Sequence, residues 1–228
     1  TNKMLSKKVK YIFTAYDKIN NFFSTNTVFN FGNPIRNLKI KSNENAHKYF
    51  GLDSSKKTIL VLGGSLGAKN INEGVLNNIS LIRESSYQVI WQTGKFYYKN
   101  ILSKNIKDKK IIIKDFINRM DLAYSVSDII ISRAGAIAIS ELCVISKPLI
   151  LVPSPNVVDD HQTKNAKAIS EKGGCVLIKD SDAKNTMLKT AFDLFENKSK
   201  MDIMKKSLSK LSSPNATQKI VNKIYEII

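Results

Sequence analysis

The sequence is poor in cysteine and histidine, and it has no long hydrophobic run. Two cysteines, Cys143 and Cys175, stand in apolar surroundings without the spacing of metal ligands, which predicts reduced core thiols and no disulfide. The two histidines, His47 and His161, lie far apart along the chain, so no histidine metal site is expected. No stretch is as long as a membrane-crossing helix, and no charged-then-apolar signal segment opens the chain. We therefore expect a soluble, cytoplasmic protein.

Acidic residues are scarce relative to basic ones. The 228 residues include 36 Lys and Arg against 19 Asp and Glu, which gives a formal net charge of +17. Such a charge fits nucleic acid, an anionic membrane surface or phosphorylated substrates as partners. The lysines are scattered through every segment, and no basic motif interleaved with aromatic residues is present, so we expect no nucleic-acid partner. The charge pattern favours attraction to acidic lipid headgroups.

Strand and helix alternate regularly from Lys57 onward, which predicts a doubly wound parallel sheet of the α/β class. A chain of 228 residues, 43% of them apolar, has room for one ordinary α/β domain and part of another. The expected strands are Thr58–Leu62, Tyr87–Gln92, Lys110–Ile113, Asp128–Ser132, Leu149–Val152 and Cys175–Ile178. The expected closing helices are Ala183–Glu196, Lys200–Leu211 and Asn215–Ile228.

The first 36 residues do not make a domain by themselves. Two short strands, at 10–14 and 27–31, with a helix over 17–23 between them, are too little for an independent fold. The sequence Gly32-Asn33-Pro34 then marks a turn, and the polar stretch 37–45 predicts an interdomain linker.

The segment from Ile129 to Ala166 contains the most informative pattern. Its apolar, β-branched opening predicts a buried parallel strand, and Ser132-Arg133-Ala134-Gly135-Ala136 turns the chain into a helix. The first N–H groups of that helix, with the positive end of its dipole, form an anion site of the kind that holds a diphosphate. Glu141 follows about one and a half turns inside the helix, where its carboxylate is placed to accept two hydroxyl hydrogens from a ribose.

A second strand follows, and it ends in the rigid loop Pro153-Ser154-Pro155-Asn156. The next helix begins near Asp160-His161-Gln162, with polar side chains at its start. Because His161 has no second histidine nearby, we interpret it as a polar loop residue rather than a metal ligand or a catalytic acid or base. The two adjacent strand ends therefore bring phosphate donors, a ribose acceptor and sugar-sized polar groups to one crevice.

A glycine-rich turn, Gly63-Gly64-Ser65-Leu66-Gly67-Ala68, follows the first expected strand of the sheet. Glycines let the backbone approach a phosphate closely and adopt positive φ, and the Ser65 hydroxyl can donate to a phosphoryl oxygen. The turn is not a P-loop, because no Gly-Lys-Ser/Thr follows. A plain strand-to-helix turn is the alternative interpretation.

These segments and three further motifs resemble the donor-binding domain of the MurG family, bacterial enzymes that add N-acetylglucosamine to the undecaprenyl-diphosphate-linked muramyl pentapeptide. The motifs occur in the family's order and span nearly the whole chain. Leu66 stands where many family members carry glutamine, which removes one polar contact to the donor and leaves the backbone cradle intact. The three further motifs are Gly32-Asn33-Pro34-Ile35-Arg36, Gln92-Thr93-Gly94-Lys95 and Phe116-Ile117-Asn118-Arg119-Met120.

The resemblance implies a GT-B glycosyltransferase with a Rossmann-like, doubly wound sheet. It divides the chain into a remnant of the N-terminal acceptor domain (1–36), a linker (37–56), a donor-binding domain (57–213) and a C-terminal helix (214–228). The implied activity is inverting transfer of N-acetylglucosamine from UDP-N-acetylglucosamine to the lipid-linked muramyl pentapeptide, with a β-1,4 linkage, at the cytoplasmic face of an anionic membrane. The resemblance implies neither a cofactor nor a metal.

The resemblance also assigns roles to individual residues. Glu141 would hold the ribose, Ile117 and Arg36 the uracil side, and Gln162 the transferred sugar, with Asn165 in support. We expect the general base to lie in the acceptor domain, nearly all of which falls outside these residues. The substrate-binding set is Arg36, Ser65, Ile117, Ala136, Ile137, Ala138, Ile139, Ser140, Glu141 and Gln162, and the phosphate loop is Gly63, Gly64, Gly67 and Gly135.

The sequence Asp180-Ser181-Asp182 is similar to the Asp-x-Asp motif that binds a metal–diphosphate in a different glycosyltransferase fold. We expect instead that Ser181 or Asp182 caps a helix that starts near Ala183. Two alternative functions stay open: the donor-binding subunit of a split UDP-sugar glycosyltransferase, and a non-catalytic UDP-sugar-binding fragment. A dinucleotide-dependent oxidoreductase is disfavoured, because no Gly-x-Gly-x-x-Gly with a following ribose-binding acid is present.

Overall fold

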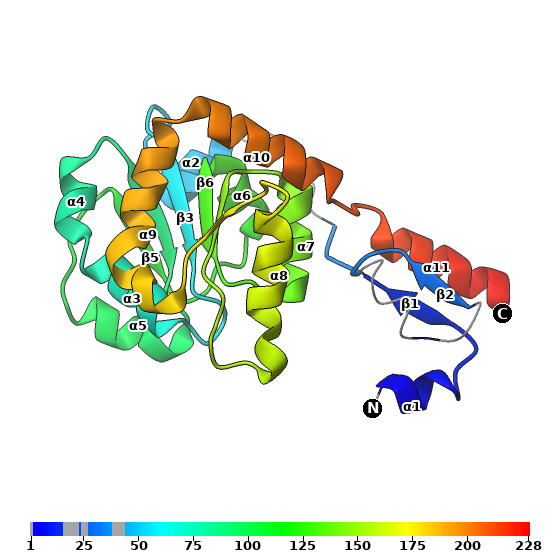
Figure 1. Cartoon of the computed structure of the whole chain (residues 1–228). Helices are drawn as coiled ribbons and strands as arrows, with labels where there is room; N and C mark the ends of the chain where they lie inside the picture. The colour runs from blue at the N-terminus through cyan, green and yellow to red at the C-terminus, as the bar shows by residue number, and fades with distance from the viewer. Residues whose placement is uncertain (1, 16–22, 24–26, 38–43) are drawn as a thin grey trace.

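The computed structural model describes residues 2–15, 23, 27–37 and 44–228 of the chain. In these residues a larger unit is built around a six-stranded sheet, and a smaller unit holds a two-stranded sheet beside the last helix (Figure 1). None of the helices in this part of the chain combines the length and the apolar character that crossing a membrane requires.

The strands of the larger sheet are all parallel and lie in the order β5-β4-β3-β6-β7-β8. Their apolar, β-branched sequences are typical of strands that are covered on both faces. Every predicted strand of this sheet is confirmed, and each of its ends agrees within one residue. The strands are β3 (Thr58–Leu62), β4 (Gln88–Gln92), β5 (Ile111–Lys114), β6 (Ile129–Ser132), β7 (Leu149–Leu151) and β8 (Val176–Leu177).

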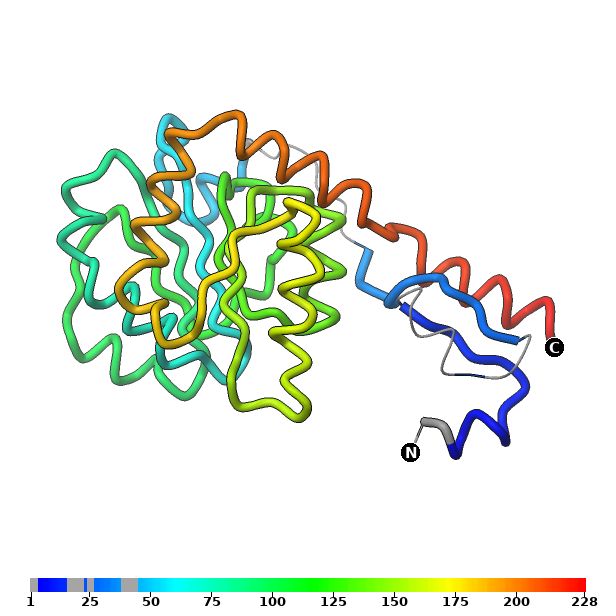
Figure 2. The backbone as a smooth tube through the Cα atoms, in the orientation of Figure 1, coloured from blue at the N-terminus to red at the C-terminus, as the bar shows by residue number. Residues whose placement is uncertain are grey.

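Helices cover both faces of this sheet, as expected for a doubly wound fold (Figure 2). Alternate residues of β3 enter two separate cores, Leu60 on one face and Ile59 on the other. The Leu60 face packs on α2, α6, α7 and α8, the Ile59 face packs on α3, α4, α5 and α9, and α10 contributes to both. These helices are α2 (Glu44–Phe50), α3 (Lys69–Leu76), α4 (Ile79–Glu84), α5 (Lys95–Leu102), α6 (Met120–Val126), α7 (Ala136–Ile145), α8 (His161–Ser170), α9 (Asp180–Phe195) and α10 (Lys198–Lys210).

Helix α9 begins earlier than the sequence predicts. Its first residue is Asp180 and its N-cap is Lys179, so the expected cap at Ser181 or Asp182 and the expected start at Ala183 are wrong. The reason lies in tertiary contacts, because the Asp180 carboxylate pairs with Arg133 and accepts a 2.6 Å hydrogen bond from Asn70 Nδ2. These two partners hold the chain in its first helical turn directly after β8.

Helix α2 lies inside the segment that we predicted as a linker, 37–56. Its residues Ala46 and Phe50, together with Leu52 after it, are buried in the same core as α6 and α7. The second half of the expected linker therefore packs as part of the larger unit, and residues 38–43 lie outside the described residues.

The smaller unit contains the parallel strands β1 (Ile12–Thr14) and β2 (Val28–Asn30) and the short helix α1 (Asn2–Ser6). The helix expected over 17–23 lies almost wholly outside the described residues. Helix α11 (Ala216–Ile227) leaves the end of α10 and runs beside the two strands (Figures 1 and 2). A hydrogen bond of 3.1 Å from Thr217 Oγ1 to the carbonyl of Ile35 ties this helix to the segment that joins the two units.

Candidate functional site

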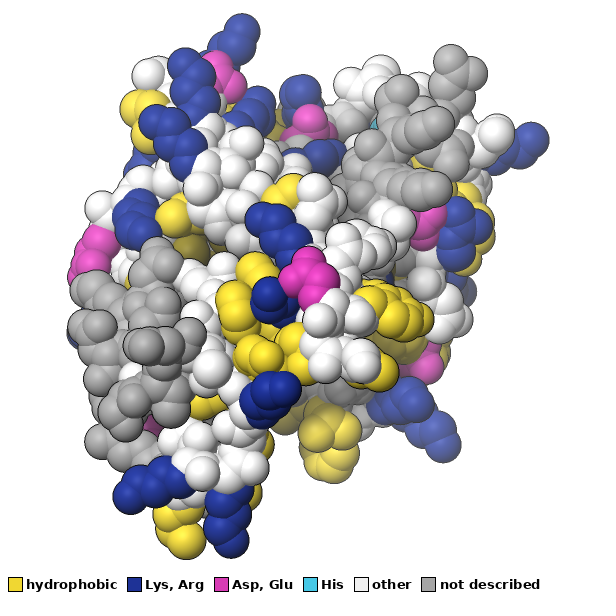
Figure 3. All heavy atoms as spheres, turned by 90° about the vertical axis from the view of Figure 1, so that its right-hand side faces the viewer, with side chains coloured by type: hydrophobic (Ala, Val, Ile, Leu, Met, Phe, Trp, Pro, Cys, Tyr) yellow, Lys and Arg dark blue, Asp and Glu magenta, His cyan; other side chains and the backbone are white. Residues whose placement is uncertain are grey.

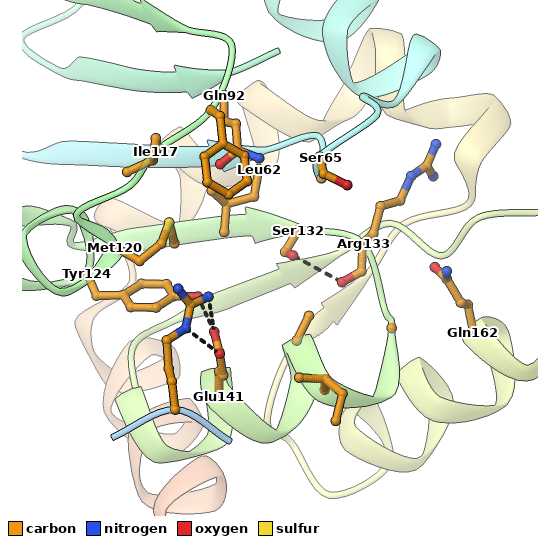
Figure 4. Close-up of a pocket in the computed structure, with 16 residues that line it drawn as sticks. Leu62, Ser65, Gln92, Ile117, Met120, Tyr124, Ser132, Arg133, Glu141 and Gln162 are labelled. Atoms are coloured by element: carbon orange, nitrogen blue, oxygen red, sulfur yellow. Dashed lines mark hydrogen bonds and ion pairs between the residues drawn. The ribbon is translucent and has the colours of Figure 1, made fainter. Parts of the chain in front are cut away.

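A cavity of about 300 Å³ opens at the carboxyl ends of β3, β4 and β6, where the loops that follow these strands meet (Figure 4). This is the edge of a doubly wound sheet at which ligands bind. Its lining gathers segments that are far apart in the sequence, from the junction of the two units to the start of α8. The lining residues are Arg36, Leu62, Gly64, Ser65, Gln92, Phe116, Ile117, Met120, Tyr124, Ser132, Arg133, Gly135, Ile137, Ala138, Glu141 and Gln162.

The carboxylate of Glu141, on the second turn of α7, has three hydrogen-bond donors. Arg36 donates from Nε to Oε1 at 2.6 Å and from Nη2 to Oε2 at 3.0 Å, and Tyr124 donates its hydroxyl to Oε2 at 3.3 Å. The hydrogen bond to Glu141 raises the pKa of Arg36, and burial raises the pKa of Tyr124. Because only 7% of the Glu141 side chain is exposed, the guanidinium supplies the charge that a buried carboxylate needs.

The N-terminus of α7 faces the cavity. Gly135 is the N-cap in an extended conformation, and no acidic residue stands in the first turn. The first N–H groups of an α-helix have no carbonyl partner within the helix, whereas the N–H of Ile139 already donates to Gly135 O at 2.9 Å. The N–H groups of residues 136–138 are therefore the donors that this helix can offer to an anion.

Three residues of the predicted substrate-binding set do not line the cavity. Ile139 points into the core and is 3% exposed. Ser140 accepts a hydrogen bond of 2.9 Å from Asn33 Nδ2 and donates to Ala136 O at 3.0 Å. Ala136 is not among the residues that line the cavity, so only its backbone N–H is offered to a ligand. The Ile139 side chain turns away because α7 presents one face to the cavity and the opposite face to the core, and Ser140 faces Asn33 in the segment that joins the two units.

The glycine-rich turn after β3 contributes two of its residues, Gly64 and Ser65, to the cavity lining. Gly63 and Gly67, which we predicted as phosphate-loop residues, do not line it. A methyl group on either would instead meet the backbone of the neighbouring loop after β4. Their small size thus serves close packing between two loops.

Ile117 lies in the loop between β5 and α6 and is 3% exposed, yet its inner side reaches the cavity (Figure 4). Within the described residues, neither its backbone N–H nor its carbonyl has a hydrogen-bond partner. A buried segment with unpaired backbone groups is suited to a ligand that brings its own donors and acceptors.

Gln162, in the first turn of α8, is oriented by its side-chain oxygen. Oε1 accepts from the backbone N–H of Ala134 at 3.2 Å and of Ser154 at 3.0 Å, so Nε2 is the atom through which this side chain would donate to a ligand. Asn165 donates to Ala134 O at 3.2 Å and supports the same turn. His161, which directly precedes Gln162, is exposed, and its Nδ1 lies 2.8 Å from Val158 O.

Sequence reasoning missed two residues that shape the site, Tyr124 and Arg133. Tyr124 follows Met120 by four residues on α6, so both face the cavity from one side of that helix. Arg133 lies at the end of β6, and its guanidinium donates to the carbonyls of Val152 and Pro153 and pairs with Asp180. The position of Arg133 directly after a predicted strand was the available signal.

The described residues contain no group of three or more His, Cys, Asp and Glu that could hold a metal ion.

Comparison with known proteins agrees with this geometry. Residues 58–221 match the family model described as "Glycosyltransferase family 28 C-terminal domain". A similar curated protein is the UDP-N-acetylglucosamine–N-acetylmuramyl-(pentapeptide) pyrophosphoryl-undecaprenol N-acetylglucosamine transferase of Cytophaga hutchinsonii, 44% identical over 100% of this chain and 62% of that protein. The protein of the same description from Bacteroides fragilis is 41% identical over 100% of this chain and 62% of its own length.

Two solved structures show the same fold. The crystal structure of Acinetobacter baumannii MurG has a TM-score of 0.72 and 28% identity, and the match covers 99% of this chain and 62% of that one. The UDP-GlcNAc 2-epimerase of Neisseria meningitidis has a TM-score of 0.67, and at 16% identity over 98% of this chain and 63% of that one it supports the fold alone.

The comparisons confirm the GT-B class and the resemblance to the MurG family that the motifs predicted. The chain spans 62% of the length of these curated relatives. With the family model matched over most of its length, the chain belongs to the family of glycosyltransferase family 28 C-terminal domains.

Proposed function

We propose that this chain supplies the UDP-N-acetylglucosamine-binding part of an inverting transferase that adds N-acetylglucosamine to an undecaprenyl-diphosphate-linked N-acetylmuramyl pentapeptide. The observation that carries the proposal is the composition of the cavity at the carboxyl ends of β3, β4 and β6. It brings together unpaired backbone groups, a buried carboxylate, a helix N-terminus with no acidic residue in its first turn and an oriented amide from segments between residues 36 and 162. The descriptions of the curated relatives support the same donor and acceptor.

Each part of the donor has a matching partner. The backbone of Ile117 would pair with the uracil edge, and Glu141 would accept the ribose hydroxyls. The N–H groups of residues 136–138 and the Ser65 hydroxyl would hold the diphosphate, with Gly64 allowing close approach. Gln162 would donate from Nε2 to the hydroxyls of the transferred sugar.

Arg36 and the ribose share one carboxylate. A carboxylate offers about four lone-pair positions, and three donor contacts from Arg36 and Tyr124 already use the oxygens of Glu141. Two ribose hydroxyls therefore require one of these donors to leave. We expect Arg36 to give up one of its two contacts, because half of its side chain is exposed whereas Tyr124 is buried. The guanidinium then still balances the charge of Glu141, and its released N–H can approach the nucleotide from the junction of the two units.

In the proposed reaction the C4 hydroxyl of the muramyl sugar attacks the anomeric carbon of the donor. A carbon–oxygen bond forms on one face, the bond to the β-phosphate oxygen breaks on the other, and UDP carries away the electron pair. The hydroxyl proton goes to a base that we assign to no residue of this chain. The contribution of these residues is electrostatic, because the α7 N-terminus and Ser65 stabilise the negative charge that grows on the departing diphosphate.

Calorimetric titration of the purified chain tests the donor assignment. We expect UDP and UDP-N-acetylglucosamine to bind at least roughly tenfold more tightly than GDP-mannose or NAD, since a larger purine does not match the Ile117 backbone. Equal affinity for GDP-mannose would remove the uracil assignment.

Transfer is tested separately with the same chain. We expect donor binding without appreciable transfer to a lipid-linked muramyl acceptor, because the proposed acceptor site and base lie outside these residues. Robust turnover by the chain alone would show that the acceptor site lies within it, and would overturn this division of labour.

The smaller unit supports a further part of the proposal, peripheral contact with the cytoplasmic face of an anionic membrane. Figure 3 views this end of the molecule, where hydrophobic side chains gather among basic ones. Met4 on α1 and Tyr225 on α11 are largely exposed, and Lys7 and Lys8, which follow α1 in the chain, are exposed too. With a net charge of +17, acidic headgroups complement this face.

Vesicle sedimentation checks the membrane contact. More chain should sediment with phosphatidylglycerol vesicles than with phosphatidylcholine vesicles, and added salt should release it, because exposed charges are screened. Equal sedimentation with both lipids, or none with either, would contradict it.

A further inference from the structure

The motif Gln92-Thr93-Gly94-Lys95 has no role in the donor contacts proposed above, apart from the place of Gln92 in the cavity lining. It forms the end of β4, the short loop after it and the first residue of α5. This loop lies directly against the glycine-rich turn after β3. We propose that it is a template that sets the shape of that turn, so that Gly94 and the N–H of Lys95 are positioning groups for the donor diphosphate. The inference rests on the proposed function.

Backbone hydrogen bonds join the two loops at Gly63 and at Ser65. Gly63 N–H donates to Gln92 O at 3.0 Å, and Lys95 N–H donates to Ser65 O at 3.0 Å. Gly64 therefore lies between two fixed points, and Ser65, the other residue of this turn in the cavity lining, is itself one of them. Because Ser65 is held through its own carbonyl, the direction of its side chain depends on the position of residue 95.

The contact between the loops admits only glycine at two facing positions. Gly94 has φ +80°, and a Cβ on it would lie well inside 3.0 Å of the N and Cα atoms of Gly67. Gly67 has φ +98°, and a Cβ on it would lie 2.5 Å from the carbonyl oxygen of Thr93. Gly64, by contrast, has nothing within 4 Å on the side where a Cβ would project. The glycines thus divide into a pair that fits the loops together and one that faces the open cavity.

The template itself is anchored in the core and on the neighbouring strand. Asn72 Nδ2 donates to Thr93 O at 2.9 Å, and Trp91 Nε1 donates to Asn72 Oδ1 at 2.9 Å, with both side chains fully or almost fully buried. On the other side, Thr93 N–H donates to Lys114 O at 2.9 Å and Gly94 N–H to Asp115 O at 3.2 Å. A satisfied buried network of this kind is rigid, so the turn after β3 is fitted to a fixed surface.

Two variants test the template by different routes. Gly94→Ala introduces the clash with Gly67. Lys95→Pro removes the N–H that holds Ser65 O and places the proline ring against that oxygen, while the helix itself accepts proline at its first position and Gly94 precedes it with an extended ψ of 151°. Because the substitution also removes the lysine side chain, its effect is measured relative to Lys95→Ala. We expect each variant to weaken UDP binding, Gly94→Ala by at least about tenfold and Lys95→Pro by several-fold, while uridine binding changes by less than about twofold.

Matched controls carry the same changes far from the cavity. Gly173→Ala substitutes a glycine of φ +73° whose Cβ would make only an ordinary contact of 3.6 Å with Ile203. Lys198→Pro places proline at the first position of α10. Neither control should change the affinity for UDP or uridine.

The comparison of UDP with uridine separates the possible results. If the parent chain does not bind UDP, the proposed function fails before the template is tested. If the parent binds UDP and both variants bind it equally well, the template is wrong and the proposed function stands. A parallel loss of UDP and uridine binding would also overturn the positioning role, because it would show a general distortion of the fold. Should Gly94→Ala fail to fold by circular dichroism, Lys95→Pro decides.

Discussion

Helices α7 and α9 both begin at the carboxyl edge of the same sheet, but their first turns differ. The first turn of α9 contains Asp180 and Asp182, and Asp180 is further held by Arg133. The first turn of α7 contains no acidic residue and opens into the cavity. Because a carboxylate at a helix N-terminus takes the place of an external anion, the dipole of α9 is satisfied within the chain. The N-terminus of α7 is left for a ligand, which supports a diphosphate site there rather than at the aspartates.

The largest expected effect concerns the ribose acceptor on α7. Replacing Glu141 with alanine should cost about 1.5–3 kcal/mol for each charged hydrogen bond lost, hence at least roughly tenfold in UDP affinity by calorimetry. The control is 2′-deoxy-UDP, which has no 2′-hydroxyl to bond with Glu141. The substitution should therefore lower the affinity for 2′-deoxy-UDP much less than the affinity for UDP. An equal loss of affinity for the two nucleotides would show that Glu141 does not hydrogen-bond to the 2′-hydroxyl of the ribose.

A second prediction makes α7 resemble α9. Ile137→Asp places a carboxylate in the first turn of α7, on a residue that is half exposed and lines the cavity. The charge suits the helix dipole, so the fold should be unharmed, but its repulsion of the diphosphate should cost about 1–2 kcal/mol, or roughly five- to thirtyfold in UDP affinity. Ile137→Asn is the matched neutral control and should lose much less. If both variants bind UDP like the parent, the diphosphate is not at this helix.

The smallest effect is expected at α9 itself. Asp182 is exposed, lies outside the cavity lining, and its Oδ1 accepts a 2.8 Å hydrogen bond from Ser181. Asp182→Asn should change UDP affinity by less than about twofold, and added manganese should not alter binding by parent or variant. Loss of binding in the variant, or a requirement for manganese, would revive the metal-dependent interpretation of Asp180-Ser181-Asp182.

Local sequence patterns predicted the sheet and several residues that line the cavity, but not the contacts that complete them. Runs such as Ile129 to Ser132 identify buried strands, and the small residues after that run identify an open helix N-terminus. The start of α9 was predicted wrongly because Asp180 pairs with Arg133, 47 residues away, and helix propensity contains no such information. The pairing of Arg36 with Glu141 spans 105 residues and was hidden for the same reason.

The glycines show the same limit at the level of single residues. The turn after β3 suggested that each of its glycines approaches a phosphate, but only Gly64 faces the cavity. Gly63 and Gly67 have no room for a side chain because a neighbouring loop packs on them. The sequence of one strand and its turn does not show which other strand and loop lie beside it. Strand order within a sheet is set by crossovers rather than by local sequence.

A crystal structure of the chain with UDP tests the central claim most directly. We predict that the diphosphate oxygens lie within hydrogen-bond distance of the N–H groups of residues 136–138 and of Ser65 Oγ, with the ribose on Glu141 and Asp180 still paired with Arg133. A diphosphate bound at Asp180 and Asp182 through a metal ion, with the α7 N-terminus unoccupied, would contradict it.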